Sequence, residues 1–571
     1  MEYFISKVKS EILAAVKGAL DQEVDLKQLE ITVPPEPTMG DFAVPCFYLA
    51  KLLRISPNQI AIDLKAKIHP HGVIKSVQNV GPYLNFYLNN KYFSRHALKE
   101  INRLRGKYGS FKLAKDQQKK IMIEYSQPNT HKEFHVGHLR NVVLGASLVN
   151  LHRFVGEKVI AANYIGDIGA HVAKCLWALE KFHQNETLPE NKGRYLGQIY
   201  TEASKKIAEN PAYKQEADEI LQKLERGDKK FIALWKKTRA WSLEDFNQIY
   251  KILNVKFDKF FYESEVEKPG KKIVQELLDK GLAEKSEGAV IINLEKYNLK
   301  NFLLLKSDGS SLYSTKELAL AQLKFNKFKI DESYVVVDMR QSFYFQQFFK
   351  TLELMGFNKK TAHISYNFVT LKEGPMASRE GNVVLFEDFF QQIAARAAAE
   401  TKKRHADWEE KKIQETAEKI ALAAIKFSML KTGNNNLIVF DPEESLSFDG
   451  FTGPYLQYTV TRINSILVKE SFGNLKEVNF GKLDLPLEKQ LVIKLAGFPQ
   501  LVQNSCLENQ PSILSQYLFD LAKLFAYYYQ TIPILAAADE IKKARLLMID
   551  SLRQVLVNGL TLLGIETVEK M

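Results

Sequence analysis

The sequence predicts an α/β fold in which a doubly wound parallel sheet is joined to an N-terminal α+β domain and a C-terminal all-α helical bundle. Three features of the 571 residues favour this fold. Short apolar runs alternate with helix-length segments from Ile121 onward, a small turn-rich region precedes them, and a helical apolar stripe fills the end of the chain. Alternation of strands and helices is typical of parallel sheets of the Rossmann type.

The first predicted domain covers residues 1–112 and mixes helix with strand. It contains the turn-rich stretch 34–37, and residues 84–89 alternate apolar and polar side chains as a half-buried strand does. Lysines and glutamines at 115–120 then indicate a linker.

The second predicted domain, residues 113–440, begins with a strand–helix–strand unit. Residues 121–125 and 159–165 are apolar enough for buried strands, and the helical pattern between them ends before Gly156. Ligands of such units bind beyond the carboxyl ends of the strands, so the loop after the first strand is the predicted site.

Further segments complete this domain. Residues from about 184 to 250 are charged and helical, and we interpret them as an insertion. Strands resume at 302–307, 333–338 and 363–369, and we expect all three to form the second half of the same doubly wound sheet.

The third predicted domain, residues 441–571, is helical. Apolar residues recur in it at intervals of three or four, which predicts a buried stripe and not a functional site. These residues are Leu546, Ile549, Leu552, Leu556, Leu560 and Leu563.

The composition excludes several classes of protein. Lys and Arg total 79 against 67 Asp and Glu, and the formal charge of 79 − 67 = +12 is compatible with a polyanionic partner. Apolar runs are shorter than the roughly 18 residues of a membrane span. The N-terminus lacks a secretory pattern, so we expect a cytoplasmic protein that binds no membrane. Three cysteines without a CxxC pair argue against disulfides.

The most specific local motif is His135-Val136-Gly137-His138, directly before the predicted helix. Two imidazoles and the unpaired N–H groups of a helix N-terminus favour an anion, and Gly137 lets a flat or phosphorylated ligand approach. Taken alone, such a histidine pair is more often a chance pair or a helix cap. No cysteine or HExxH pattern accompanies it, so no metal held by the protein is expected.

The residues around this motif resemble a known family. HVGH is similar to the HIGH signature of class I aminoacyl-tRNA synthetases, and Glu124-Tyr-Ser-Gln-Pro-Asn129, followed by Lys132, resembles the arginyl-tRNA synthetase version. Residues 375–382 resemble this family's second signature, MSTRKGN. Further matches, such as 163–169 and 447–467, follow in order along the chain, and the sequence is identified as a member of the arginyl-tRNA synthetase family.

The resemblance implies ATP-dependent ligation of L-arginine to tRNA(Arg) through an arginyl-adenylate. The implied ATP-binding residues are His135, Gly137, His138, Met376, Ser378 and Arg379. We expect His135 and His138 to act in catalysis by neutralising charge on the phosphates. Ser378 stands where the usual KMSKS signature has a lysine, so the catalytic cation is expected from Lys132 or Arg379. Mg²⁺ is expected to arrive with ATP.

The resemblance also implies an arginine pocket, which must be acidic because a guanidinium is always charged and pairs with carboxylates. Tyr313 and Glu317 are expected to hold the guanidinium. The other implied residues are Glu124, Ser126, Asn129, His135, Glu263 and Gln341. Glu317 departs from the aspartate of the family's YLTRD pattern and reaches one methylene farther, which makes lysine the alternative substrate. Glu380 replaces a common lysine and is expected to point outward.

RNA contacts are implied at both ends of the chain. Tyr455, Tyr458 and Arg462 lie at i, i+3 and i+7, on one helical face, where aromatic and cationic groups suit splayed bases. Tyr529 and Met571 resemble further anticodon-contacting positions. Tyr83 and Asn85 resemble residues that read the outer corner of tRNA. The alternative for each tyrosine is packing in the core.

Two other classes of function stay open. The missing signature lysine is compatible with a catalytically silent tRNA-binding paralogue, although the intact HVGH argues against it. A nucleotidyltransferase acting on a small acid without RNA would leave the N-terminal domain and about 120 C-terminal residues unexplained. The family resemblance implies a monomer.

Overall fold

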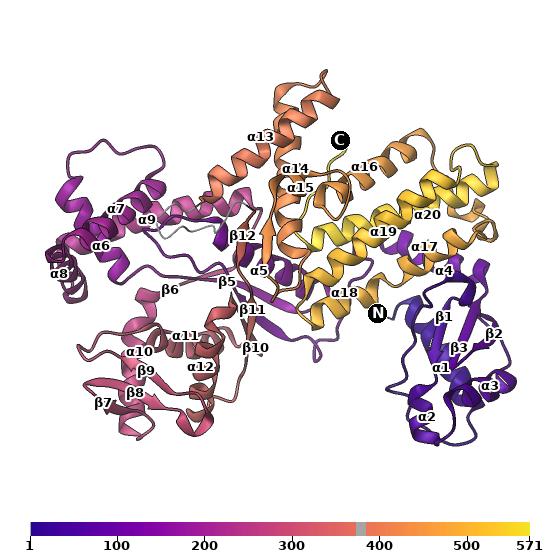
Figure 1. Ribbon diagram of the computed structural model, residues 1–571, viewed down its shortest axis with the longest axis horizontal. Coiled ribbons are helices and arrows are strands. Elements are labelled where there is room, and N and C mark those ends of the chain that lie inside the picture. The colour runs from indigo at the N-terminus through magenta and orange to yellow at the C-terminus, as the bar shows by residue number, and fades with distance from the viewer. Residues whose placement is uncertain (1, 373–383) are drawn as a thin grey trace.

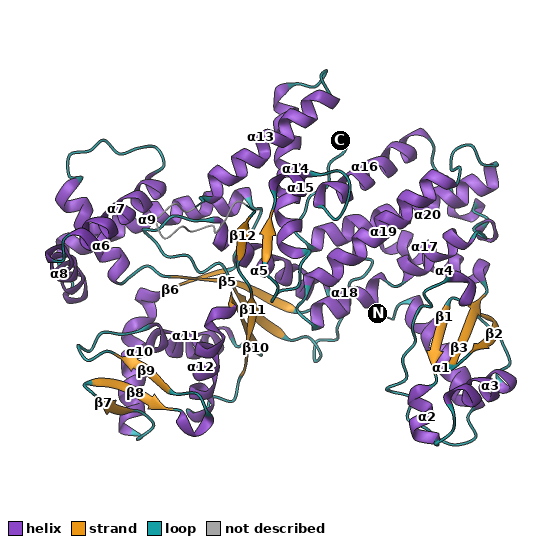
Figure 2. Ribbon diagram, in the orientation of Figure 1, coloured by secondary structure: helices purple, strands orange, loops and turns teal. Residues whose placement is uncertain are grey.

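A computed structural model describes residues 2–372 and 384–571. Figure 1 shows a parallel sheet at the centre, with a helical insertion and a small antiparallel sheet on one side and the C-terminal bundle and N-terminal domain on the other. Helices dominate everywhere except in the three main sheets (Figure 2). The predicted fold class is therefore confirmed.

The N-terminal domain packs helices on an antiparallel sheet of order β1-β3-β2. Its elements are α1 (Phe4–Ala19), η1 (Pro37–Met39), β1 (Phe42–Pro45), α2 (Phe47–Leu53), α3 (Pro57–Lys67), β2 (Ile74–Val80), β3 (Tyr83–Leu88), α4 (Asn90–Leu104) and η2 (Arg105–Lys107). Leu84, Phe86 and Leu88 are buried on one face of β3, as the predicted alternation of this strand requires.

The central sheet has the order β11-β10-β4-β5-β6, and every neighbouring pair is parallel. Its strands are β4 (Lys120–Glu124), β5 (Lys158–Ile165), β6 (Lys259–Tyr262), β10 (Glu332–Asp338) and β11 (Lys360–Tyr366). From β4 the chain first builds outward through β5 and β6, and it later returns to β10 on the other side. The carboxyl end of β4 therefore lies at the point where the strand order reverses, which is where open α/β sheets bind ligands.

One predicted strand lies elsewhere. Residues 302–307 were expected in the doubly wound sheet, but β9 (Asn301–Leu305) belongs to a separate antiparallel sheet with β7 (Glu284–Ser286) and β8 (Ala289–Asn293). The prediction was wrong because Leu303 is 40% exposed while Phe302 and Leu304 are buried. This one-sided burial is typical of antiparallel strands and not of central parallel ones.

Four helices form the insertion between β5 and β6, and they share an apolar core of their own. They are α6 (Ala170–Phe182), α7 (Lys192–Glu209), α8 (Ala212–Arg226) and α9 (Lys229–Ile252). Between β6 and β11 lie α10 (Glu263–Asp279), η3 (Glu295–Tyr297), α11 (Tyr313–Phe328), η4 (Met339–Gln341) and α12 (Ser342–Leu354).

The remaining chain is mainly helical. Its elements are β12 (Val369–Leu371), α13 (Phe386–Arg404), α14 (Glu410–Leu430), β13 (Ile438–Phe440), α15 (Pro442–Leu446), α16 (Gly453–Lys469), η5 (Leu475–Glu477), η6 (Phe480–Lys482), α17 (Pro486–Ala496), α18 (Phe498–Leu507), α19 (Pro511–Thr531) and α20 (Asp539–Leu562). The predicted stripe on α20 is buried throughout. In the part of the chain that the structure describes, no helix is long and apolar enough to cross a membrane.

Two buried cations connect these parts. Arg140 of α5 (Val136–Phe154) donates to carbonyl oxygens of Asn367 at 2.5 Å and Asn436 at 2.8 Å, so the helix that follows β4 is fastened to the loops before β12 and β13. Lys426 of α14 donates to the carbonyls of Leu253, just after α9, at 2.7 Å and of Gly564, just after α20, at 2.6 Å. Lysine near a helix C-terminus satisfies carbonyls that have no partner within the helix.

Candidate active site

The loop that follows β4 packs against helix α9 through His131. His131 is fully buried, its backbone N–H donates to Ser242 at 2.9 Å, and its Nε2 lies 2.8 Å from the hydroxyl of Thr238. Burial lowers the pKa of His131 to about 3. This imidazole is therefore a neutral structural group. Sequence analysis assigned no role to α9, because its contacts with the loop span more than 100 residues of chain.

The two signature histidines start helix α5. Nδ1 of His135 accepts the N–H of Gly137 at 3.0 Å, and Nδ1 of His138 accepts the N–H of His135 at 3.2 Å. Each ring therefore carries its proton on Nε2 when it is neutral. A side-chain carbon at Gly137 would lie 2.7 Å from the His135 ring. The His135 cap therefore requires glycine at this position, whether or not a ligand approaches it.

Both histidines are neutral donors near pH 7 in the free protein. Burial, and then the nearby Lys132, lower the pKa of His135 to about 4. Burial and the neighbouring His135 and Lys132 hold the pKa of His138 well below its usual range. The two rings therefore present Nε2–H groups that can donate hydrogen bonds, and Lys132 is the cation beside them. Its ammonium lies 4.9 Å from the ring centroid of Tyr200. The expected action of the two rings on phosphates stays a prediction.

The centre of the site is compact because Gly166 has no side chain. A carbon built there would lie 2.1 Å from Oδ1 of Asn129 and 3.5 Å from Oε1 of Glu263. Gly166 and Glu263 directly follow β5 and β6, and Asn129 lies in the loop after β4, where it forms a parallel bridge with Gly166. Asn129 and Glu263, two of the residues expected to bind arginine, are thereby brought close together.

Asp167 fixes the start of the helix that carries Glu263. Its carboxylate accepts the N–H of Ser264 at 2.9 Å and the hydroxyl of Ser264 at 2.7 Å, and Nε of Arg239 lies 2.8 Å from it. Arg239 comes from α9 and stacks on the ring of Tyr262 at 4.0 Å. The insertion therefore helps to hold α10 against the sheet.

Three glutamates and two lysines form a buried charged cluster beside Gly166, which we call the charged pocket. Lys324 lies 2.6 Å from Glu124, and Lys316 lies 2.6 Å from Glu263, and all four side chains are almost completely buried. Glu317 lacks an ion-pair partner within 4 Å among the described residues. Its burial, and then the charge of Glu124, raise its pKa to about 8. Three carboxylates against two ammonium groups leave one negative charge once Glu317 ionises.

Two phenols belong to this pocket and were missed by sequence analysis. The hydroxyls of Tyr164 and Tyr344 are buried, and neither finds a hydrogen-bond partner among the described residues. Burial and then the charge of Glu317 raise the pKa of both well above the usual range of tyrosine. Unpartnered buried hydroxyls are costly, and they are typical of sites where a ligand supplies the partner. Tyr164 lies in the segment 163–169 that resembles the family, but the sequence does not show that its side chain points into the pocket.

The other predicted arginine-binding residues have different surroundings. Tyr313, at the start of α11, is 58% exposed, and Gln341 is exposed in the turn after β10. The hydroxyl of Ser126 is instead buried and lies 2.6 Å from that of Tyr250, so it supports the loop. Met376, Ser378, Arg379 and Glu380 lie outside the described residues.

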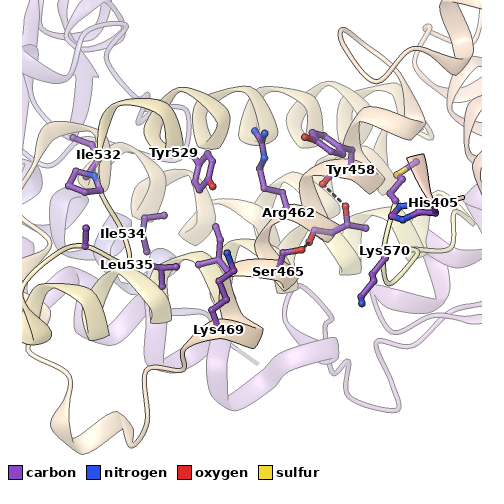
Figure 3. Close-up of a pocket in the computed structure, with 15 residues that line it drawn as sticks. His405, Tyr458, Arg462, Ser465, Lys469, Tyr529, Ile532, Ile534, Leu535 and Lys570 are labelled. Carbon is purple, nitrogen blue, oxygen red and sulfur yellow. Dashed lines mark hydrogen bonds between the residues drawn. The ribbon is translucent and has the colours of Figure 1, made fainter. Parts of the chain in front are cut away.

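A second candidate site lies on the C-terminal bundle. A hollow of about 620 Å³ is lined by Tyr458, Arg462, Tyr529 and Met571, among others. Arg462 lies between the two tyrosines, 5.1 Å from the ring centroid of Tyr458 and 5.0 Å from that of Tyr529 (Figure 3). Lys469 and Lys570 add cations to the same wall. Planar and positive groups thus face one open hollow, as an RNA base and its phosphate require.

The remaining predicted RNA residues lie outside this hollow. Tyr455 packs against Phe519 with ring centroids 5.8 Å apart, so it contributes to packing despite sharing a helix with Tyr458. In the N-terminal domain Tyr83 is 40% exposed beside the exposed ring of Phe47. Asn85 is only 3% exposed, so an RNA would reach it only after a local rearrangement.

Comparisons with known proteins agree along the whole chain. Residues 101–441 match the family described as tRNA synthetases class I (R), catalytic domain; residues 456–571 match the DALR anticodon binding domain, and residues 6–88 the arginyl tRNA synthetase N terminal domain. The arginine–tRNA ligase of Bdellovibrio bacteriovorus is 37% identical over 94% of this chain and 93% of its own length. The chain belongs to the arginyl-tRNA synthetase family.

Other arginyl-tRNA synthetases extend this result. The arginine–tRNA ligase of Clostridium perfringens is 37% identical over 99% of this chain and 100% of its own. The structure titled Thermus thermophilus arginyl-tRNA synthetase superposes with a TM-score of 0.83 at 27% identity, covering 99% of this chain and 100% of that one. The predicted family is confirmed, and the charged pocket and the bundle hollow lie in the segments that match the synthetase catalytic and anticodon-binding domains.

Gly166 offers a direct test of the pocket in this arginyl-tRNA synthetase. Gly166→Ala should lower arginine-dependent ATP–pyrophosphate exchange by about tenfold or more, because Asn129 must move by about 1 Å or more from its position. The free energy of unfolding, measured by urea titration, should change by no more than about 2 kcal/mol.

Gly18→Ala is the matched control, since a carbon there meets nothing within 4 Å. It should leave exchange unchanged. Normal arginine KM and exchange rate in the Gly166→Ala enzyme would contradict the proposed placement of Asn129.

Proposed function

We propose that the chain ligates L-arginine to tRNA(Arg) in two steps. The arginine carboxylate attacks the α-phosphate of ATP and expels pyrophosphate, and the arginyl group then passes to the terminal ribose of the tRNA. The observation that carries the proposal is the charge distribution at the ends of the parallel strands. A pocket that gains one surplus negative charge when Glu317 ionises lies on one side, and a helix N-terminus with neutral donors and Lys132 lies on the other.

At the phosphate end the protein supplies hydrogen bonds that are already oriented. His135 and His138 have ring centroids 3.9 Å apart, and each presents Nε2–H because its Nδ1 is occupied. Oriented donors stabilise charge that develops on phosphate oxygens without reorganisation. Lys132 supplies the positive charge that the second signature lacks at Ser378. Mg²⁺ is proposed to travel with ATP, since carboxylate ligands would suit it better than these nitrogen donors.

At the opposite end the acids suit a guanidinium. Glu317 and Glu263 offer carboxylates, and the hydroxyls of Tyr164 and Tyr344 offer acceptors to a planar group with five N–H donors. Asn129 and Glu124 are proposed to face the α-amino and carboxylate end. A lysine substrate would supply a single ammonium and leave more of these acceptors unpaired, which disfavours it.

The bundle hollow is proposed to receive anticodon bases by stacking on Tyr458 and Tyr529 beside Arg462. Tyr83 is proposed to contact the outer corner of the tRNA. These positions favour a synthetase over a nucleotidyltransferase without RNA, and the buried acidic pocket gives no support to a catalytically silent paralogue. In keeping with the family resemblance, we further propose a monomer that acts in the cytoplasm.

The function is tested by ATP–pyrophosphate exchange with arginine or lysine, each with and without total tRNA. We expect exchange with arginine that requires tRNA, as the family resemblance implies. Exchange with lysine would assign a different specificity. A folded protein that binds tRNA but exchanges with neither amino acid would be the silent paralogue.

Lys132 should act on the chemical step. Lys132→Ala is expected to lower the maximal exchange rate by about tenfold or more, because one cation near the phosphates is lost, while the arginine KM changes less than about threefold. Lys205→Ala, an exposed lysine of α7, is the control and should behave as the unaltered enzyme. Equal losses in exchange rate and in arginine affinity would contradict the assignment of Lys132 to the chemical step and not to arginine binding.

Arginine affinity should depend on pH through Glu317. Its pKa is raised to about 8, so the free protein holds this proton near pH 7, and a bound guanidinium must displace it. As the pH increases toward 8, arginine affinity should therefore increase by up to about tenfold per pH unit, and above pH 8 it should become constant. Calorimetric titration from pH 6 to 9 measures this slope. The Glu317→Gln variant should bind arginine weakly, with an affinity that does not change with pH. An unchanged pH dependence in that variant would exclude Glu317 as the source of the pH dependence.

A further inference from the structure

One ammonium group of the protein itself occupies the pocket proposed for arginine. Lys316, in the first turns of α11, is 7% exposed, and its Nζ lies 2.6 Å from Oε2 of Glu263. The same Nζ lies 5.9 Å from the ring centroid of Tyr313, another residue proposed to hold the guanidinium. A side-chain cation therefore takes one of the carboxylates on which a substrate cation would depend.

The surroundings of this pair are rigid, whereas the lysine side chain is flexible. A carbon built at Gly270 of α10 would lie 2.4 Å from the carbonyl oxygen of Thr315, so α10 and α11 touch without intervening side chains. The hydroxyl of Ser314 donates to the carbonyl of Leu303 at 2.5 Å and fastens α11 to the small sheet. The carboxylate of Glu263 thus stays in place, while the four-carbon stem of Lys316 can change rotamer.

A second carboxylate lies one helical turn away. Glu267 follows Glu263 by four residues on α10, so both lie on the same face of the helix. Its Oε1 accepts the hydroxyl of Ser311 at 2.6 Å, and this serine lies just before α11. An ammonium displaced from Glu263 can therefore move to Glu267 and keep an anionic partner.

Resting on the proposed function, we propose that Lys316 is a specificity-determining residue that competes with the substrate. Its ammonium holds Glu263 in the free enzyme, and the guanidinium of arginine displaces it toward Glu267. No covalent change is involved.

This displacement of Lys316 by the substrate favours arginine over lysine. A lysine substrate would replace one ammonium–carboxylate pair by another of the same kind, with little net gain. A guanidinium offers a planar set of donors, so it can pair with Glu263 and also reach Glu317 and the unpartnered hydroxyls of Tyr164 and Tyr344. A ligand must therefore gain more free energy than the Lys316–Glu263 pair provides. The guanidinium of arginine does so, and the ammonium of lysine does not.

The test is Lys316→Met, which keeps the unbranched stem as far as Cε and removes the charged ammonium. Arginine and lysine binding are measured by calorimetry on the full chain at about pH 8.5, where a freed carboxylate is ionised. We expect arginine to bind about threefold to tenfold more tightly, because the competing state is removed, and lysine to gain more than arginine. Arginine-dependent exchange by the unaltered enzyme is measured first, so that failure of the proposed function is recognised separately.

Lys324→Met is the matched control, since it removes the other buried lysine of α11, which pairs with Glu124. It leaves Glu263 paired with Lys316, so it should not narrow the preference for arginine over lysine. Unchanged or weaker arginine binding by folded Lys316→Met would overturn the proposal. If that variant does not fold, Glu267→Gln decides: loss of the second carboxylate should weaken arginine binding about threefold, and unchanged binding would overturn the proposal.

Discussion

Parallel pairing of β4 with β5, and of β5 with β6, is the constraint on which the active site depends. It brings the ends of these strands to one edge, so that Asn129, Gly166 and Glu263 meet although 134 positions separate the first from the last. No single segment of the chain contains the site. The glycine at the meeting point shows how closely the segments approach, because there is no space for even one carbon atom beside Asn129.

The two ends of the site handle charge in opposite ways. At the start of α5, burial keeps His135 and His138 neutral, so an anion bound there would meet oriented donors and the nearby cation Lys132. In the pocket, burial instead holds a proton on Glu317 until a cation arrives. Desolvation is the main cause of both pKa shifts. Its consequence differs because a buried base loses its proton and a buried acid retains one.

Much of this arrangement was accessible from the sequence. Hydrophobic periodicity predicted β4, α5, β5 and the stripe of α20, because each is buried in the way its period requires. The strand at 302–307 was assigned to the wrong sheet, since a run of three leucines does not reveal that the first of them, Leu303, faces solvent. Motifs identified Glu124, Asn129 and Glu263, but the lysines that pair with the two acids come from a distant helix. Their pairing depends on how α11 packs against α10, which no local pattern records.

The tautomers of the two histidines were also beyond sequence reasoning, because they follow from which backbone N–H each Nδ1 accepts. The same is true of Tyr164 and Tyr344, whose hydroxyls matter only because nothing else in the described chain satisfies them.

Lys426 has a consequence for how distant parts of the molecule move. Its ammonium holds the chain just after α9 and just after α20 at the same time. Helix α9 also carries Arg239, which lies against Asp167 and so steadies the first turn of α10 with Glu263. A displacement of α20 along its axis would therefore act on α9 through one shared cation, and α9 in turn contacts Asp167 at the start of α10. The bundle and the charged pocket are thus connected by a continuous path of contacts through α9.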